Sequence, residues 1–135
     1  MIKIIIADDH KIFREGLKEL LGSYGKYDVI AEAANGVELI ELIAGNLPDI
    51  ILLDIFMPLM DGFKVAEIIR SKYPSVKVLV LSMQVNTDTY NKMLKEGVKG
   101  YILKESASND LETALDEIYR NGSYFPKELL NKIIP

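Results

Sequence analysis

Several residue types that build common protein sites are missing or scarce in this 135-residue chain. It has no cysteine, which excludes disulfide bonds and metal sites made of thiolates. Its single histidine, His10, cannot form a zinc site on its own. No apolar run approaches the roughly 20 residues that a membrane-spanning helix needs, so we expect a cytoplasmic protein with no membrane partner.

The chain also has no excess of basic residues. It carries 20 acidic and 16 basic residues, a formal net charge of −4, whereas a surface that binds nucleic acid is rich in lysine and arginine. We therefore expect no dedicated nucleic-acid surface within this chain. The rest of the composition is ordinary for a folded domain, since 49% hydrophobic residues at this length suffice for one buried core.

Strand-like and helix-like hydrophobic patterns alternate along the chain. Apolar runs predict strands over residues 2–7, 27–34, 50–53, 76–81 and 100–103. Helical spacing of apolar residues predicts helices over residues 10–24, 37–44, 63–72, 86–96 and 106–120. Five such units with short links predict an α/β fold, a five-stranded parallel sheet flanked by five helices.

Acidic residues stand where two of the predicted strands end. The run over residues 4–7 ends on Asp8 and Asp9, and the run over residues 50–53 ends on Asp54. Taken singly, each acid could be a helix cap or a turn residue. The carboxyl ends of parallel strands meet at one edge of a sheet, however, so we expect the three carboxylates to gather. Their mutual repulsion predicts a divalent cation between them, and Mg²⁺ prefers such oxygen ligands.

Two further polar residues follow the remaining strands of this edge. Ser82 follows the fourth predicted strand and Lys104 follows the fifth. A serine hydroxyl can donate to a phosphoryl oxygen, a lysine supplies a point charge, and a carboxylate such as Asp54 can attack phosphorus. The set therefore predicts phosphoryl transfer to an aspartate.

The same residues make the chain resemble the receiver domain of bacterial two-component response regulators, a CheY-like fold that also resembles flavodoxin. The resemblance covers residues 2 to about 120 and implies the strand order 2-1-3-4-5. Within that family, three segments are most similar to the NarL/LuxR-type transcriptional regulators: residues 7–10 (ADDH), 81–83 (LSM) and 100–104 (GYILK).

The resemblance implies a role for each matched residue. Asp54 would be the phosphoacceptor, and Asp8 and Asp9 would hold Mg²⁺ together with Asp54 and the backbone carbonyl of Phe56. Ser82 and Lys104 would contact the phosphoryl group.

Tyr101 would be an aromatic switch that moves into space vacated by Ser82. The donor would be a sensor histidine kinase, and phosphorylation could produce a homodimer. We interpret His10 as a surface residue near the pocket without a part in the chemistry.

The chain departs from many family members at two places. Glu105 follows Lys104 where many receivers have proline, so we expect a trans peptide bond there, because a non-proline cis bond costs about 3 kcal/mol. Phe56 and Gln84 flank the path of attacking water, so the lifetime of the phosphorylated form cannot be copied from relatives.

The end of the sequence changes character. We predict a receiver domain over residues 1–121 and, over residues 122–135, a linker or the start of an output domain. The resemblance implies that a helix-turn-helix domain follows such a linker, so we expect a segment of a longer regulator that binds DNA only through that domain.

Other functions remain open on the sequence alone. A single-domain receiver that acts by docking to proteins would have the same residues. A phosphatase of the haloacid-dehalogenase type would need a second acid where Phe56 stands, and a flavodoxin-like electron carrier would need hydroxyl residues where Asp8 and Asp9 stand. We predict a switch that phosphorylates and dephosphorylates itself, not an enzyme in the ordinary sense.

Overall fold

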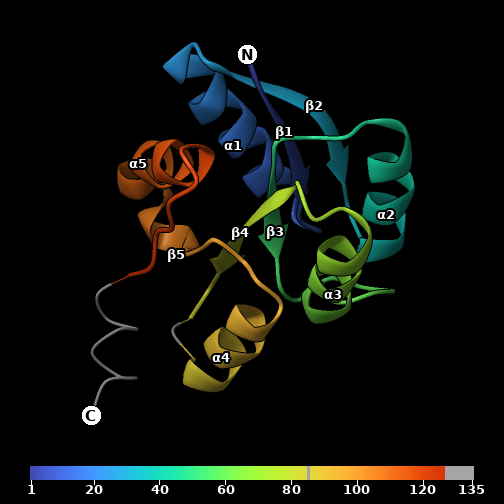
Figure 1. The fold of residues 1–135 in the computed structure, drawn as a ribbon. Helices are drawn as coiled ribbons and strands as arrows, with labels where there is room; N and C mark the ends of the chain where they lie inside the picture. Colours follow the sequence, from blue (N-terminus) through green and yellow to red (C-terminus); the bar gives the residue numbers. More distant parts are fainter. Residues whose placement is uncertain (85, 127–135) are drawn as a thin grey trace.

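Strands and helices alternate along residues 1–84 and 86–126, the parts of the chain that the computed structural model describes (Figure 1). The strands are β1 (Ile2–Ala7), β2 (Tyr27–Ala33), β3 (Ile50–Asp54), β4 (Lys77–Ser82) and β5 (Gly100–Leu103). The helices are α1 (Lys11–Tyr24), α2 (Gly36–Gly45), α3 (Gly62–Lys72), α4 (Thr87–Lys95) and α5 (Ala107–Tyr119). A short 3-10 helix, η1 (Lys104–Ser106), precedes α5.

All ten predicted elements are present, with small differences at their ends. β3 includes Asp54, and β4 runs one residue later than predicted, so both strands carry their polar end residue inside the sheet. The hydrophobic patterns could not show this, because backbone pairing continues past the last apolar side chain.

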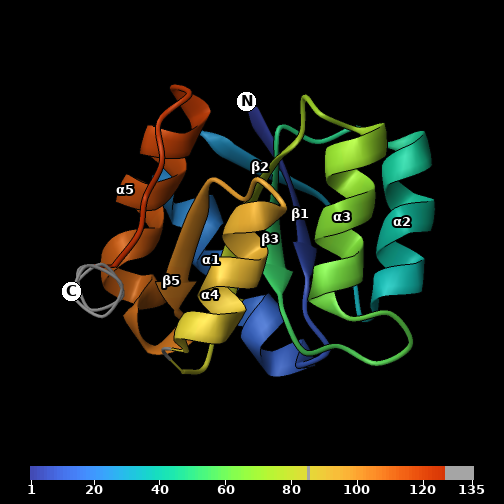
Figure 2. The same ribbon diagram turned by 60° about the horizontal axis from the view of Figure 1, so that its bottom comes forward.

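The five strands form one parallel sheet in the order β2-β1-β3-β4-β5, which confirms the predicted fold and strand order. Helices α2, α3 and α4 cover one face and α1 and α5 cover the other (Figure 2). Because both faces are covered, the central strand β3 is buried along its whole length. Its side chains alternate: Ile51 and Leu53 face α2–α4, whereas Ile50 and Leu52 face α1 and α5.

Three helices begin at a side chain that caps them. Asn35, Asp61 and Asn86 each accept a hydrogen bond from the backbone N–H three residues further on, at the starts of α2, α3 and α4. These caps fix where the loop before each helix ends and the helix begins. Within the described residues, no helix has the length and apolar content to cross a membrane.

The segment after α5 returns to the edge of the sheet. Tyr124 forms a parallel bridge beside β5: Tyr101 N–H donates to the carbonyl of Tyr124, and Tyr124 N–H donates to that of Lys99, both at 3.0 Å. The ring of Phe125 packs edge-on against Tyr90 of α4. The predicted boundary at residue 121 stays a prediction, and residues 127–135 of the predicted linker lie outside the described residues.

Candidate functional site

The register of the sheet brings the acidic strand ends together. Ala7 of β1 pairs with Leu53 of β3, so Asp8 and Asp54, one residue further on, leave the sheet at the same level. Neither Asp8 nor Asp9 caps α1, since the N-cap residue is His10. The gathering of carboxylates that the sequence predicts is therefore present.

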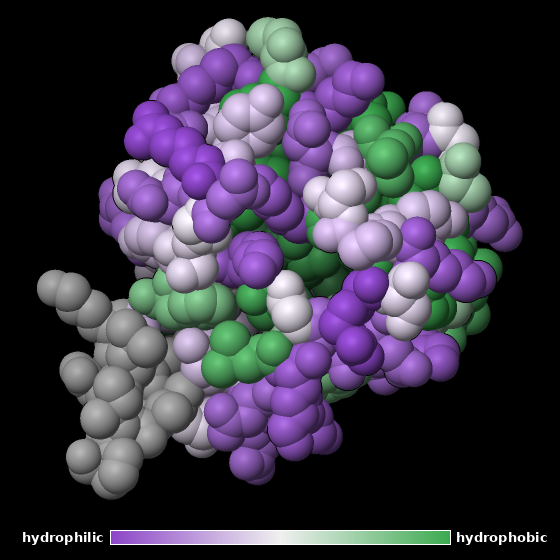
Figure 3. Space-filling model, viewed as in Figure 1, coloured by the Kyte–Doolittle hydropathy of each residue, from purple (hydrophilic) through white to green (hydrophobic). Residues whose placement is uncertain are grey.

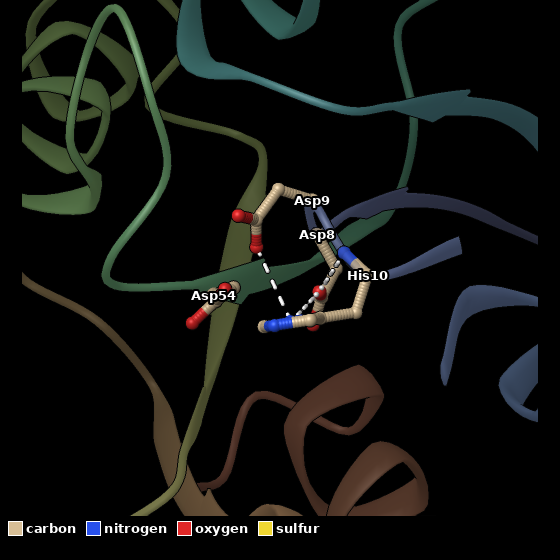
Figure 4. A group of neighbouring side chains, drawn as sticks. All are labelled: Asp8, Asp9, His10 and Asp54. Carbon is tan, nitrogen blue, oxygen red and sulfur yellow. Dashed lines mark hydrogen bonds and ion pairs between the residues drawn. The ribbon is translucent and has the colours of Figure 1, made fainter. Parts of the chain in front are cut away.

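One donor atom from each of Asp8, Asp9, His10 and Asp54 lies within 4.8 Å of the others (Figure 4). Asp8 and Asp54 are buried, whereas Asp9 and His10 are exposed. Nδ1 of His10 lies 3.1 Å from Oδ1 of Asp8 and 3.3 Å from Oδ1 of Asp9. The cluster thus has two buried carboxylates at its base and two groups open to solvent above them.

Lys104 provides the buried positive charge of the site. Its Nζ lies 2.7 Å from Oδ2 of Asp8 and 3.6 Å from Oδ2 of Asp54. On its other side, the ammonium lies 4.7 Å from the centre of the Phe13 ring, a cation–π contact. Because the side chain is 7% exposed, these interactions are weakly screened by water.

One lysine does not neutralise the acids around it. Burial and, to a smaller extent, the charge of Asp8 raise the pKa of Asp54 from 3.8 to about 6, although Lys104 and the Phe56 N–H oppose the change. The folded domain therefore holds an ionised Asp54 at neutral pH at a cost in free energy. An added cation would relieve this repulsion.

Ser82 is the last residue of β4, the strand that pairs with β3. Its hydroxyl donates to the carbonyl of Gln84 at 2.9 Å and accepts from the Gln84 N–H at 3.4 Å, so it is held by its own turn. Ser82, Asp54 and Lys104 line one cavity of about 320 Å³. The structure thus brings the predicted acceptor, hydroxyl and lysine to one opening.

A larger cavity, of about 540 Å³, lies away from this site. It is lined by residues of α3, of the turn that precedes β4 and of the segment after α4, among them Arg70, Pro74, Val76 and Gly97. None of the predicted site residues lines it, whereas Asp54, Ser82 and Lys104 line the smaller cavity. In the space-filling view, hydrophilic side chains cover much of the visible face, and hydrophobic ones show between them (Figure 3).

Tyr101 is already inside the domain. It is fully buried, and its ring packs edge-on against Tyr90 at a centroid distance of 5.6 Å. Burial raises the pKa of Tyr101, and the neighbouring Ser82 hydroxyl opposes this. The Tyr101 hydroxyl has no hydrogen-bond partner among the described residues. The aromatic ring predicted to move inward thus already occupies an inward position in this structure.

Phe56 lies two residues after Asp54, the predicted acceptor. Its N–H donates to Oδ1 of Asp54 at 3.4 Å, and its side chain is 69% exposed. The use of its carbonyl as a metal ligand stays a prediction. The Lys104–Glu105 bond is trans, as are all peptide bonds of the described residues.

Sequence reasoning missed two residues of α1 that contact the site. Arg14 Nη1 donates to the carbonyl of Asp8 at 2.5 Å, and Phe13 contacts Lys104. The sequence did offer one signal: both residues lie on the face of α1 that packs on the sheet. His10 was expected near the pocket, but its contact with both acids was not, because the backbone at the helix start decides where its ring points.

The donor set fits Mg²⁺. Carboxylate oxygens are the ligands that this ion prefers, and Asp8, Asp9 and Asp54 offer three of them in one cluster. After the larger effect of burial, the charge of Asp8 also raises the pKa of Asp54, so these two carboxylates repel each other. Both observations support a hard divalent cation at this place.

The sequence matches the response regulator receiver domain family over residues 4–116. The chain is a response regulator receiver domain. Its relatives include Transcriptional regulatory protein LnrK of Bacillus subtilis (strain 168), which is 40% identical over 134 residues, 99% of this chain and 61% of LnrK. Transcriptional regulatory protein DegU of Brevibacillus brevis is 36% identical over 133 residues, 98% of this chain and 56% of DegU. The receiver domain thus spans less than two thirds of the length of either relative.

A solved structure gives the same assignment. The two-component response regulator of the LuxR family from Aurantimonas sp. SI85-9A1 superposes with a TM-score of 0.91 at 28% identity, over 97% of this chain and 94% of that one. The predicted resemblance to the NarL/LuxR-type regulators is confirmed. The domain is a signalling module of a two-component system rather than a classical enzyme, and its family works as a phosphorylation-dependent switch.

Proposed function

We propose that Asp54 accepts a phosphoryl group from a phosphohistidine of a partner sensor kinase, with Mg²⁺ bound by Asp8, Asp9 and Asp54. The observation that carries the proposal is the convergence of Asp54, Ser82 and Lys104 on one cavity beside the acidic cluster. When bound, the Mg²⁺ ion would supply positive charge to the phosphoryl oxygens.

The transfer exchanges one bond to phosphorus for another. A carboxylate oxygen of Asp54 forms a bond to phosphorus as the P–N bond to the donor imidazole breaks, and the leaving imidazole nitrogen takes a proton from solvent. The acceptor must be ionised to attack. At neutral pH most of the Asp54 side chains are ionised, because their pKa is raised only to about 6. Water later removes the phosphoryl group and restores the carboxylate.

Lys104 and Ser82 respond to the new charge. The phosphoryl group carries roughly two negative charges and three acceptor oxygens, in place of the single charge of the Asp54 carboxylate. Lys104 lies 3.6 Å from Asp54 and reaches such oxygens by a small movement. The Ser82 hydroxyl must release the carbonyl of Gln84 to donate to the phosphoryl group, so its local hydrogen bond opposes the change.

Tyr101 transmits the structural change from the phosphorylation site to α4. Its buried ring lies between the neighbourhood of Ser82 and the Tyr90 ring of α4, so a shift of Ser82 alters the space around both rings. The proposed switch stabilises one arrangement of α4 and β5 over another. Such a population shift needs about 5.5 kcal/mol of differential interaction to move from 1:99 to 99:1.

The family indicates the partners. The similarity to transcriptional regulatory proteins supports an output domain that binds DNA in the full-length protein, and a homodimer formed on phosphorylation is a further part of the proposal. A receiver that acts by docking to other proteins is the alternative. Comparing DNA binding and size of the full-length protein, with and without phosphorylation, separates the two.

The test of the chemistry is direct. The chain is incubated with Mg²⁺ and acetyl phosphate, and its intact mass is measured. We expect a gain of one phosphoryl group for the wild type and for Asp61→Asn, in which an acid outside the cluster is changed, and none for Asp54→Asn. The proposal fails if the wild type gains no mass, or if Asp54→Asn gains as much.

A further inference from the structure

His10 places a nitrogen ligand beside the three carboxylates, and the proposed phosphotransfer gives it no part. Its ring turns toward the acids rather than away from them, with Nδ1 3.1 Å from Asp8 and 3.3 Å from Asp9 (Figure 4). One ring nitrogen of His10 lies within 4.8 Å of one oxygen of Asp54 as well. The cluster therefore offers one nitrogen and three oxygen donors from four residues.

The two distances from Nδ1 of His10 to Asp8 and Asp9 match those between neighbouring ligands of one metal ion. Nitrogen and oxygen ligands lie about 2.0–2.2 Å from a bound divalent transition metal, so neighbouring ligands are about 3.0 Å apart in an octahedron and about 3.4 Å apart in a tetrahedron. The distances of 3.1 and 3.3 Å from Nδ1 to the two acids match this range. Nδ1 therefore lies where a ligand shared with Asp8 and Asp9 would lie.

The contact without metal has a simple origin. A carboxylate oxygen accepts hydrogen bonds, so Nδ1 must carry the proton that it shares with Asp8. A cation between these atoms takes the place of that proton, and the neutral ring then turns a lone pair toward the ion. Because the His10 side chain is 65% exposed, the displaced proton passes directly to water.

We propose that Nδ1 of His10 is a metal ligand that makes this site prefer divalent first-row transition ions, such as Co²⁺ and Zn²⁺, over Mg²⁺. The inference rests on the metal site of the proposed function. Imidazole suits the transition ions, whereas Mg²⁺ prefers oxygen, so the three carboxylates serve both kinds of ion and His10 only one. Loss of the ring should therefore change the affinities selectively.

The experiment compares wild type with His10→Ala by calorimetric titration with Co²⁺ and with Mg²⁺, without phosphate. Ile12→Ala is the matched control, because Ile12 is 88% exposed two residues further on. We expect His10→Ala to lower the Co²⁺ affinity about tenfold or more, while its Mg²⁺ affinity stays equal or rises. Ile12→Ala should bind both ions like the wild type.

Nuclear magnetic resonance gives a second readout that does not depend on affinity. The chain has one histidine, so its imidazole signals need no assignment among several rings. Zn²⁺ should shift the ¹⁵N resonance of Nδ1 toward that of a metal-bound nitrogen and leave Nε2 protonated, whereas Mg²⁺ should not.

The outcomes separate this inference from the proposed function. Equal Co²⁺ affinity for wild type and His10→Ala, or a Zn²⁺ shift at Nε2 instead of Nδ1, overturns the role of His10 even when Mg²⁺ binds and supports phosphorylation. If neither ion binds the wild type, the metal site of the proposed function fails, and this inference fails with it.

Discussion

Replacement of Asp54 by asparagine should stabilise the folded domain in the absence of metal ions. Asparagine has nearly the shape of aspartate and removes the negative charge that burial and Asp8 oppose. The difference between a pKa of 3.8 and one of about 6, at about 1.4 kcal/mol per pH unit, corresponds to about 3 kcal/mol at pH 7.5. This value is already net of the long contact with Lys104, at 3.6 Å, and we expect a gain of about 1–3 kcal/mol.

The gain should depend on pH with a defined sign. The folded-state pKa of Asp54 is raised, so between pH 6 and 3.8 the folded state binds more protons than the unfolded state. The wild type therefore becomes more stable relative to the variant as the pH falls. The advantage of Asp54→Asn should be full above pH 7, about half at pH 5 and nearly absent at pH 4.

Urea unfolding followed by circular dichroism measures this difference, because the chain has no tryptophan for fluorescence. Wild type and Asp54→Asn are compared at pH 7.5 and 5.0 in the presence of a chelator. The control is Asp61→Asn, since asparagine also accepts the capping hydrogen bond from the Lys64 N–H, and should change stability by less than about 0.5 kcal/mol. A variant no more stable than wild type at pH 7.5, or a gain independent of pH, would refute the reasoning.

Three further predictions concern residues around the site. Lys104→Met leaves Asp8 buried without the cation at 2.7 Å, and should lower the free energy of unfolding by about 3 kcal/mol or more in urea at pH 7.5. Phe125→Ala removes the edge-on contact with Tyr90 and should lower it by about 1 kcal/mol in the same assay. Gly62→Ala places a methyl group 2.7 Å from the backbone of the β3–α3 loop and should lower it by about 1–3 kcal/mol, measured by thermal melting.

Each of these three variants has a control variant with a similar substitution at another position. Lys64→Met alters a lysine that is 57% exposed, and Leu59→Ala alters a side chain that is 80% exposed, so both should be nearly neutral. Gly16→Ala meets nothing within 4 Å in the middle of α1, so it should be neutral or slightly stabilising. A site variant that behaves like its control contradicts the contact assigned to it.

The sequence could place the acids and Lys104 because their positions depend only on strand ends. Parallel pairing aligns those ends, so the apolar runs before Asp8 and Asp54 suffice to bring the carboxylates together. The same reasoning could not predict the ring of His10. Its direction depends on the extended backbone at the start of α1, which no apolar pattern records.

The sequence pattern also could not predict that the segment after α5 pairs with the sheet. Gly122 and Pro126 are typical of a linker, and nothing local in the segment between them indicates a strand. Tyr124 bonds there because β5 is the last strand of the sheet and has a free edge, and this is known only once the strand order is known. Long-range pairing of this kind is a property of the whole sheet.

The bridge between Tyr124 and β5 connects the neighbourhood of Asp54 to the segment after α5. Tyr101 is linked to the tail in two ways: its N–H donates to Tyr124, and its ring packs on Tyr90, which packs on Phe125. Tightly packed rings do not move independently, so we expect a change beside Ser82 that displaces Tyr101 to displace residues 124 and 125 as well. The route needs no movement of the sheet as a whole. Because the tail is bonded to the strand that carries Tyr101, a domain joined to the chain after residue 126 would be connected directly to the responsive edge.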